Sequence, residues 1–171
     1  IEQEEHTFKI MYQATYRLNA IEYFANVEII GNLDDTISFH FVGTSNCDFL
    51  RNRIGICVHH PIQDCVGQSV EIIQGDSSSV VSVFPQLIAP HQTFKNIQQL
   101  IWKTPNQVQA RLLFEGDTFE TEDQRNWTDN SFKTYSTPLG IPFPVAVKKG
   151  DGVEQKVILT VINTNAIDAV L

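Results

Sequence analysis

Short segments rich in β-branched and aromatic residues recur along this chain, and turn-forming residues separate them at intervals of roughly 8 to 14 residues. No stretch carries the apolar periodicity of a long amphipathic helix. The pattern therefore predicts an all-β fold with little helix, an antiparallel β-sandwich or barrel, of which we favour the sandwich. Residues 47–52 are a candidate for a short helix. Strands are expected at residues 8–16, 23–30, 36–42, 54–60, 70–73, 80–84, 94–102, 108–114, 145–147 and 153–162.

The length of the chain suits a single folded domain over residues 1–171. The first residues have neither the basic nor the apolar region of a signal peptide, and an initiator Met is lacking. We therefore expect a processed protein or, in preference, a domain excised from a longer one. The final residues, 163–171, are partly apolar but show no strand pattern, so we expect either a frayed tail or the lead into a further domain.

The charge balance limits the partners of this chain, because 20 acidic and 12 basic residues give a formal net charge of −8. Nucleic acids and anionic membrane surfaces both require clustered Lys and Arg, so neither is expected to bind. No apolar run reaches the roughly 18 residues of a membrane-spanning helix. The three cysteines, Cys47, Cys57 and Cys65, are an odd number and a poor disulfide framework, which predicts reduced thiols in a cytoplasmic protein. Zinc-site, phosphate-loop and metalloprotease motifs are absent, so we expect no metal and no cofactor.

Residues 115–135 combine acidic, amide and aromatic side chains without the periodicity of a core segment. Such a mixture is typical of a surface that binds a small polar ligand. If residues 119–123 are extended, Glu120 and Glu122 lie about 7 Å apart on one face, and Asp123 lies on the other. Close carboxylates push their pKa values apart, which suits an acid and a base. The alternative is a solvated loop in which the charges pair with one another.

Residues 51–61 present two different faces if they are extended. Period two places Arg53, Cys57 and His59 on one face, which joins a cation, a thiol and an imidazole and could floor a cleft. The opposite face is apolar and points into the core, with His60 at its end. His59 or His60 is a candidate general acid or base, because histidine titrates near neutral pH. The alternative is a histidine that only forms a structural hydrogen bond at a strand end.

Residues 84–94 contain two prolines, which favour a bent, extended path that displays His91 and Gln92. This segment is either the wall of a cleft or a crossover between two sheets.

Three segments of the chain resemble a known family. They are FEGDTFETEDQRNWTDNSFKTYSTPLGIPFPV at 114–145, DFLRNRIGICVHHP at 48–61 and FPQLIAPHQTF at 84–94. All three are similar to D-apionate lactonase-like proteins of bacterial sugar catabolism. The most specific part is EDQRNWTDNSFKTY at 122–135, which departs from the family pattern at Asn130, where the family has alanine. The similarity extends over about residues 48–160.

The resemblance implies a β-sandwich that is joined, in the whole protein, to a (β/α)-barrel domain. That barrel is then the expected location of the main catalytic carboxylates. The sandwich also resembles galactose-mutarotase-like supersandwiches, which use a histidine and a carboxylate on a concave sheet. This second likeness concerns the fold and carries little information about function.

We therefore favour a β-sandwich domain that binds a small-molecule carbohydrate, such as a sugar, a sugar acid or a sugar lactone, and belongs to a sugar-lactone hydrolase. In this hypothesis cations hold a carboxylate or a lactone oxygen, an aromatic ring stacks on the sugar, and polar side chains hydrogen-bond its hydroxyl groups. The base is His59 or Glu122. The binding candidates are Arg53, Arg125 and Lys133 as cations, Trp127 and Tyr135 as aromatic rings, and Glu120, Glu122, Asp123 and Asn126 as hydroxyl partners.

Two alternatives from other classes are kept. The first is an aldose epimerase of the mutarotase type, in which a carboxylate base and a histidine acid open the sugar ring. The second is a non-catalytic module whose polar segment docks on a neighbouring domain. A convergent pair of histidine and carboxylate would favour the epimerase, and a large exposed apolar patch would favour docking.

Overall fold

The computed structural model of the protein describes residues 1–163, and Ile162 and Asn163 are described by their backbone alone. The expected tail or domain lead at 163–171 therefore falls, after Asn163, outside the described residues. In chain order, the elements are β1 (Glu2–Gln3), β2 (Phe8–Leu18), β3 (Ile21–Gly31), β4 (Thr36–Ser45), β5 (Phe49–Arg51), β6 (Cys57–Pro61), α1 (Ile62–Cys65), β7 (Ser69–Gln74), β8 (Ser79–Val83), β9 (Phe94–Lys103), β10 (Val108–Glu115), β11 (Phe119–Asp123), the 3-10 helix η1 (Gln124–Trp127), β12 (Ser131–Tyr135), β13 (Val145–Val147) and β14 (Gly152–Asn163).

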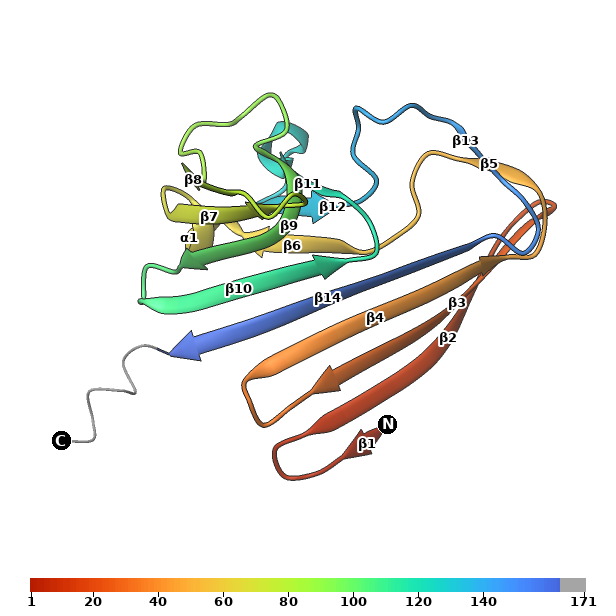
Figure 1. Ribbon diagram of the computed structural model, residues 1–171, viewed down its shortest axis with the longest axis horizontal. Coiled ribbons are helices and arrows are strands. Elements are labelled where there is room, and N and C mark those ends of the chain that lie inside the picture. Colours follow the sequence, from red (N-terminus) through yellow and green to blue (C-terminus); the bar gives the residue numbers. More distant parts are fainter. Residues whose placement is uncertain (164–171) are drawn as a thin grey trace.

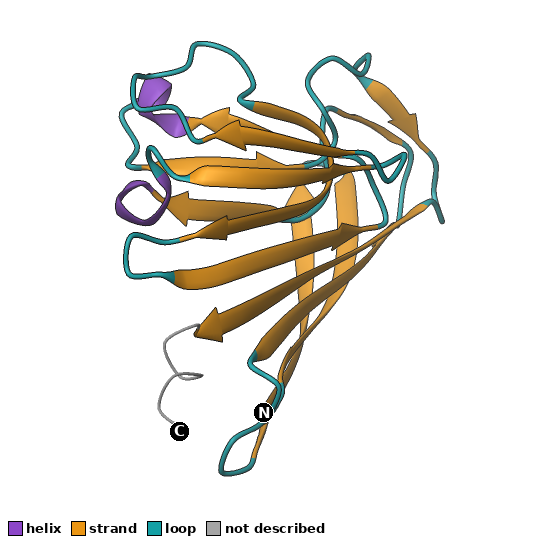
Figure 2. Ribbon diagram, turned by 60° about the vertical axis from the view of Figure 1, so that its left-hand side comes forward, coloured by secondary structure: helices purple, strands orange, loops and turns teal. Residues whose placement is uncertain are grey.

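Most strands belong to one antiparallel sheet that curls over at one end (Figure 1). In the described part of the chain its order is β1-β2-β3-β4-β14-β10-β9-β11-β12-β6, and β7 and β8 join it through β9. The long strands β2, β3, β4 and β14 extend beyond the curled part, where β5 and β13 form a separate pair (Figure 1). Both short helices lie at the curled end of the molecule (Figure 2).

Strand β9 is where the sheet turns from one layer into the other. Leu100 pairs with β10 on one edge of β9 and with β7 on the opposite edge. Ile97, three residues earlier, pairs with β11 in place of β10 and still has β7 on its other side. Strands β10 and β11 therefore follow each other along the same edge of β9, and β11 carries the sheet into the second layer.

The connection between β10 and β11 requires a glycine. Gly116 has a φ of 91°, which is left-handed backbone that other residues adopt only with strain. A Cβ atom at this position would also clash with the carbonyl oxygen of Glu154 on the neighbouring strand β14. Gly116 thus lets the chain turn at a point where two strands are in close contact.

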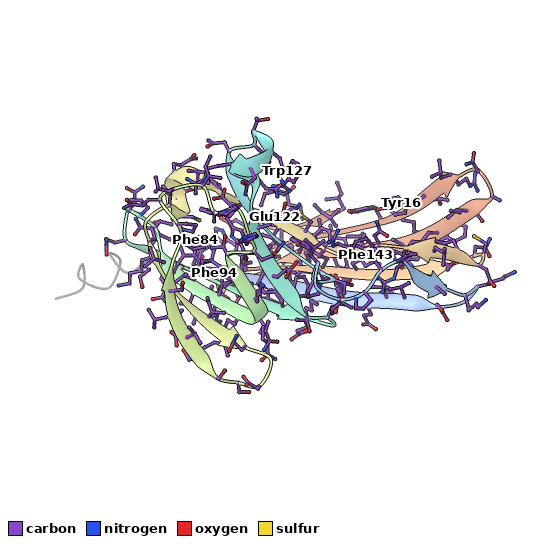
Figure 3. The ribbon with its side chains drawn as sticks, turned by 90° about the horizontal axis from the view of Figure 1, so that it is seen from above. Tyr16, Phe84, Phe94, Glu122, Trp127 and Phe143 are labelled. Atoms are coloured by element: carbon purple, nitrogen blue, oxygen red, sulfur yellow. The ribbon has the colours of Figure 1, made fainter. Side chains whose placement is uncertain are left out.

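Between the two layers lies a core rich in aromatic rings. Phe84 is fully buried, and its ring packs 5.0 Å from that of Phe94 and 5.1 Å from that of Phe132, measured between ring centroids. Figure 3 shows Phe84 and Phe94 inside the curled half of the molecule. Phe119 of β11 and Phe114 of β10 meet at 4.6 Å beside the corner. Because β11 and β12 contribute Phe119 and Phe132 to this core, their opposite faces are fixed toward solvent.

The structure confirms the predicted fold class, since antiparallel strands dominate the described residues and helix is limited to α1 and η1. The expectation of a helix at 47–52 is wrong. Phe49–Arg51 form β5 instead, because β13 supplies an antiparallel partner that lies far away in the sequence. The strand expected at 54–60 begins later and includes Pro61, which is tolerated because β6 is the last strand of the sheet path.

Candidate functional site

Three neighbouring strands, β11, β12 and β6, place polar side chains in rows on the solvent-facing side of the second layer. Residues that pair directly in antiparallel strands project to the same side of the sheet. One row runs through Glu122, Lys133 and His59, and the next runs through Glu120, Tyr135 and Cys57. The sequence-based expectation that Glu120 and Glu122 share a face, and that Cys57 and His59 share a face, is confirmed by this register.

A polar cavity of about 730 Å³ opens on this face. One wall comes from β11, η1 and β12, and the other comes from the segment before β9, which contributes His91 and Gln92. Figure 3 shows two of its lining residues, Trp127 and Glu122, close together. The segment 84–94 is therefore the wall that the sequence suggested. Of the predicted site residues, the polar cavity is lined by Arg53, Glu122, Asn126, Trp127, Lys133 and Tyr135.

Charges and rings in the polar cavity are arranged around Tyr135. The Nζ atom of Lys133 lies 5.0 Å from the centre of the Tyr135 ring, and the guanidinium carbon of Arg53 lies 5.2 Å from it. Glu122 accepts a hydrogen bond of 2.8 Å from the indole Nε1 of Trp127 and pairs with Lys133 at 3.3 Å. Arg53, by contrast, pairs with no carboxylate among the described residues. The polar cavity thus keeps one cation that is not neutralised.

Glu120 does not contribute an open carboxylate to the polar cavity. It is buried, and its Oε1 atom accepts hydrogen bonds from the Tyr135 hydroxyl at 2.5 Å and from the Leu139 amide at 2.6 Å. Burial and the Glu120 carboxylate together raise the pKa of Tyr135, so this hydroxyl stays protonated. The geometry therefore does not give the expected acid and base pair of Glu120 and Glu122; Glu120 instead fixes the Tyr135 ring.

Asp123 and Arg125 point away from the polar cavity and hold its wall. The Asp123 side chain is fully buried, and Arg125 donates to it from Nε at 2.9 Å and from a terminal nitrogen at 2.7 Å. Arg125 also donates to the backbone carbonyls of residues 85–87. Burial by itself would raise the pKa of Asp123, but the hydrogen bonds from Arg125 and from the Ala89 amide lower it below its ordinary value. Both residues were expected to bind ligand, and the structure gives them a supporting position.

Asn126 both faces the polar cavity and supports its wall. It lines the polar cavity, yet its Nδ2 group also donates to the carbonyls of Ala89 at 2.5 Å and of Asp123 at 3.0 Å. Its amide therefore joins η1 to the segment before β9.

The two adjacent histidines lie on opposite sides of β6. His60 is buried, contacts Thr134 at 2.7 Å and packs edge-on against Trp102. Burial lowers the pKa of His60 to about 4, with a smaller effect from the neighbouring His59, so His60 is neutral at neutral pH. His59 is exposed on the polar face, beside the cavity and not in its lining. Of the two candidates, only His59 can meet a solute.

Gln124 is a cavity residue that was not among the predicted site residues. It lines the polar cavity, is only 8% exposed, and its Nε2 group has no hydrogen-bond partner among the described residues. A buried amide without a partner costs stability, and a ligand oxygen would satisfy it. The signal was present in the sequence, because Gln124 continues the two-residue period of Glu120 and Glu122.

Metal-ligand clusters and membrane-spanning helices are both lacking from residues 1–163. No three His, Cys, Asp or Glu side chains converge there as metal ligands would. No helix in that part of the chain is long and apolar enough to span a bilayer.

Comparison with known proteins identifies relatives in sequence and a solved structure of similar fold. The family model of the D-apionate lactonase N-terminal domain matches residues 1–164. D-apionate lactonase of Brucella anthropi is 34% identical over 165 residues, which cover 96% of this chain and 27% of that protein. The chain thus spans about a quarter of the length of this relative. A solved homologue of GalM/aldose epimerase from C. elegans matches with a TM-score of 0.52 at 7% identity, over 95% of this chain and 67% of that chain.

The last likeness shows the fold alone, a galactose-mutarotase-like arrangement of antiparallel strands. The family match and the identity to the Brucella protein carry more weight, because they extend over nearly the whole sequence. Together with the observed sheet they establish that this chain belongs to the D-apionate lactonase N-terminal domain family.

Proposed function

We propose that the polar cavity binds a sugar acid or its lactone, and that the chain is the N-terminal domain of a sugar-lactone hydrolase. The observation that carries this proposal is the convergence, in one cavity of about 730 Å³, of two cations, an exposed indole and amide donors. A volume of this size is within the usual range of roughly 300–1,000 Å³ for small-molecule sites. The curated relative is a lactonase by name, which is consistent with a ligand of this class.

Each chemical group of such a ligand has a matching side chain. A carboxylate or a lactone carbonyl suits Arg53, because this cation has no carboxylate partner among the described residues, and Lys133 contacts the same Tyr135 ring. Trp127 is 71% exposed and can cover the apolar face of a sugar ring. Gln124 and Gln92 line the polar cavity and can hydrogen-bond to hydroxyl groups.

Tryptophan fluorescence tests the proposal directly, because the chain has two tryptophans and only Trp127 is exposed, Trp102 being 8% exposed. Titration with D-gluconate and D-glucono-1,5-lactone, among other aldonic acids, their lactones and free aldoses, should give a saturable change in emission. Lys133→Ala should weaken binding at least about tenfold, since a charged hydrogen bond is lost. Lys95→Ala is the matched control, because Lys95 is exposed on β9 and does not line the polar cavity.

Unchanged affinity would remove the proposed site, measured by fluorescence in Lys133→Ala and by NMR titration in Trp127→Ala, since the latter variant lacks the reporter indole. An NMR titration gives the same answer by position, since amide shifts should cluster on residues 115–135 and near Arg53.

The epimerase alternative has less support from the geometry. It requires a carboxylate and a histidine that act on one sugar ring. Glu122 and His91 both line the polar cavity, but the described partners of Glu122 are Trp127 and Lys133. If the chain accelerated the interconversion of aldose anomers, this alternative would replace the one above.

A docking function is favoured by a different part of the molecule. The end of the sheet away from Trp127 has an apolar cavity of about 640 Å³ between β2, β3 and β5 (Figure 3). Its lining includes Tyr16 and Leu18, which are 56% and 67% exposed. Because the chain spans about a quarter of its curated relative, we propose that another domain of the longer polypeptide covers this end. The (β/α)-barrel expected from the sequence is the candidate for that domain.

A further inference from the structure

A chain of hydrogen-bonding groups beside the polar cavity starts at a thiol. The Sγ atom of Cys57 lies 3.6 Å from Nε2 of His59, two residues along β6. On the other side of the imidazole, Nδ1 of His59 lies 3.0 Å from the hydroxyl of Ser131, and this hydroxyl donates to Asp129 at 3.1 Å. Asp129 itself is 3.8 Å from the same Nδ1 atom. Strands β6 and β12 and the loop before β12 thus connect a nucleophile, a base and a carboxylate.

The hydrogen bonds assign the tautomer of His59. The Ser131 hydroxyl donates its hydrogen bond to Asp129, so toward His59 it can act only as an acceptor. Nδ1 must therefore carry the imidazole proton in the neutral ring, and Nε2 presents its lone pair to the Cys57 thiol. This is the tautomer that a general base for Cys57 needs.

The Cys57 thiol opens toward the proposed ligand. Cys57 is exposed and lines a small cavity of about 240 Å³, here named the thiol cavity. The thiol cavity and the polar cavity share Arg53, Glu122, Lys133 and Tyr135 as common walls. A ligand held by Arg53 and Lys133 would therefore have a group within the thiol cavity.

The resting protonation state explains why a base is required. Burial raises the pKa of the Cys57 thiol, Lys133 works against this effect and Glu122 adds to it. Cys57 is therefore a neutral thiol at neutral pH, and it becomes a strong nucleophile only if a neighbour takes its proton. Nε2 of His59 is in position to do so.

We propose that Cys57 is a catalytic nucleophile that opens the ring of a sugar lactone, with His59 as its base and with Ser131 and Asp129 as positioning residues. This inference rests on the proposed function, because the lactone must first bind in the polar cavity. Sulfur forms a bond to the carbonyl carbon, and the thiol proton moves to Nε2 of His59. The bond between that carbon and the ring oxygen then breaks, and the imidazolium returns the proton to this oxygen, which becomes a hydroxyl group.

The product of this step is a thioester of the open hydroxy acid on Cys57, and water completes the reaction. His59 takes a proton from the water as its oxygen attacks the thioester carbon. The bond from carbon to sulfur breaks, and the proton returns to sulfur. The net reaction is lactone plus water to sugar acid, with the thiol regenerated. In both steps negative charge develops on the carbonyl oxygen, where the cations Lys133 and Arg53 can stabilise it.

Mass spectrometry of the whole chain after mixing with D-glucono-1,5-lactone and other aldonolactones tests this proposal. Because ring opening releases no leaving group, the adduct should add the full mass of the lactone to the peptide that contains Cys57. The adduct should be removed by hydroxylamine and should be absent in Cys57→Ala. Cys47→Ser is the matched control, because Cys47 hydrogen-bonds to the Glu22 backbone, lines neither the polar cavity nor the thiol cavity, and should leave the adduct unchanged.

The rate of lactone hydrolysis above the uncatalysed background gives the second measurement. His59→Gln should lower kcat by about 100-fold, the usual effect of losing a general base. Asp129→Asn should lower kcat about tenfold and leave KM unchanged, which a loss of binding would not do. An unchanged denaturant midpoint in this variant separates the lower kcat from a loss of folded protein.

Three outcomes would overturn the inference. Hydrolysis at the same rate in Cys57→Ala would show that the thiol is not the nucleophile. Saturable quenching of Trp127 without hydrolysis or adduct would leave the proposed binding function intact and remove the catalytic step. If no lactone binds, the proposed function and this inference fail together.

Discussion

At the scale of single residues, two buried ionisable groups have opposite effects on the stability of the fold. Asp123 is charged and is compensated by Arg125 and by a backbone amide, and its pKa is lowered. His60 has the Thr134 hydroxyl as its partner and rings around it, and its pKa is lowered to about 4 because burial disfavours the charged form. The lowered pKa of Asp123 means that the fold stabilises its carboxylate, which is the form present at neutral pH. The lowered pKa of His60 means that the fold disfavours its protonated form, so protonation of His60 destabilises the fold.

This difference predicts how stability depends on pH. Between about pH 6.5 and pH 4 an unfolded chain carries a proton on His60 and the folded chain does not, so the free energy of unfolding falls as the pH is lowered. A pKa shift from 6.5 to about 4 corresponds to about 3 kcal/mol across this window. Urea unfolding at a series of pH values would measure it. Asp123 contributes its own loss only at lower pH, as the carboxylate is protonated.

The matched variants for this experiment are His60→Gln and His6→Gln. His60→Gln should flatten the dependence between pH 6.5 and pH 4, whatever its effect on stability at neutral pH. His6 is exposed near the N-terminus, so His6→Gln should keep the full dependence. An equal slope in the wild type and in His60→Gln would contradict the buried, neutral state of His60.

At the scale of elements, the sequence predicts strands correctly where one face of the strand is apolar. It fails where a segment becomes a strand only because it pairs with a strand that is distant in the sequence. The segment 119–123 alternates between core residues and carboxylates, so the face of Glu122 could be assigned before the structure was known. Strand β12 was missed because its outward residues, including Lys133 and Tyr135, look like loop residues until Phe132 is seen in the core. The buried position of Asp123 depends on contact with residues 85–89, which no local pattern reveals.

The corner between β10 and β11 gives a prediction at this scale. Gly116→Ala combines a strained left-handed backbone with a clash against the carbonyl of Glu154, so we expect it to lose about 3 kcal/mol of stability. Gly150→Ala separates the two effects, because Gly150 has a φ of 92° and has no atom within 4 Å of the added Cβ. Its cost should be about 1 kcal/mol.

Denaturant midpoints of the two glycine variants provide the measurement. Equal losses would mean that the backbone conformation alone matters, and that the sheet can move away from the added methyl group at the corner.

At the scale of the whole molecule, the second layer covers only part of the long sheet. Most core residues lie under the curled end, and β3 adds Tyr23, Ala25 and Val27, while β2 contributes no buried residue to the core (Figure 1). The apolar face of these strands ends in exposed residues such as Tyr12, Tyr16 and Leu18. The sequence predicted that these segments are strands, but it could not show that nothing in residues 1–161 covers the outer part of their apolar face. A face of this kind is stable in water only at a cost, and it is suited to contact with a further domain.

This uncovered face should bind a dye that is specific for exposed apolar surface. We expect 8-anilinonaphthalene-1-sulfonate to fluoresce on the native chain, with its site in the apolar cavity between β2, β3 and β5. Leu18→Glu places a charge in the lining of this cavity and should reduce the fluorescence by at least about half. Leu87→Glu is the control, because Leu87 is 85% exposed but lies on the segment before β9, outside the apolar cavity. An equal loss in both variants would mean that scattered surface residues bind the dye, and the case for a docking face at this end would then fail.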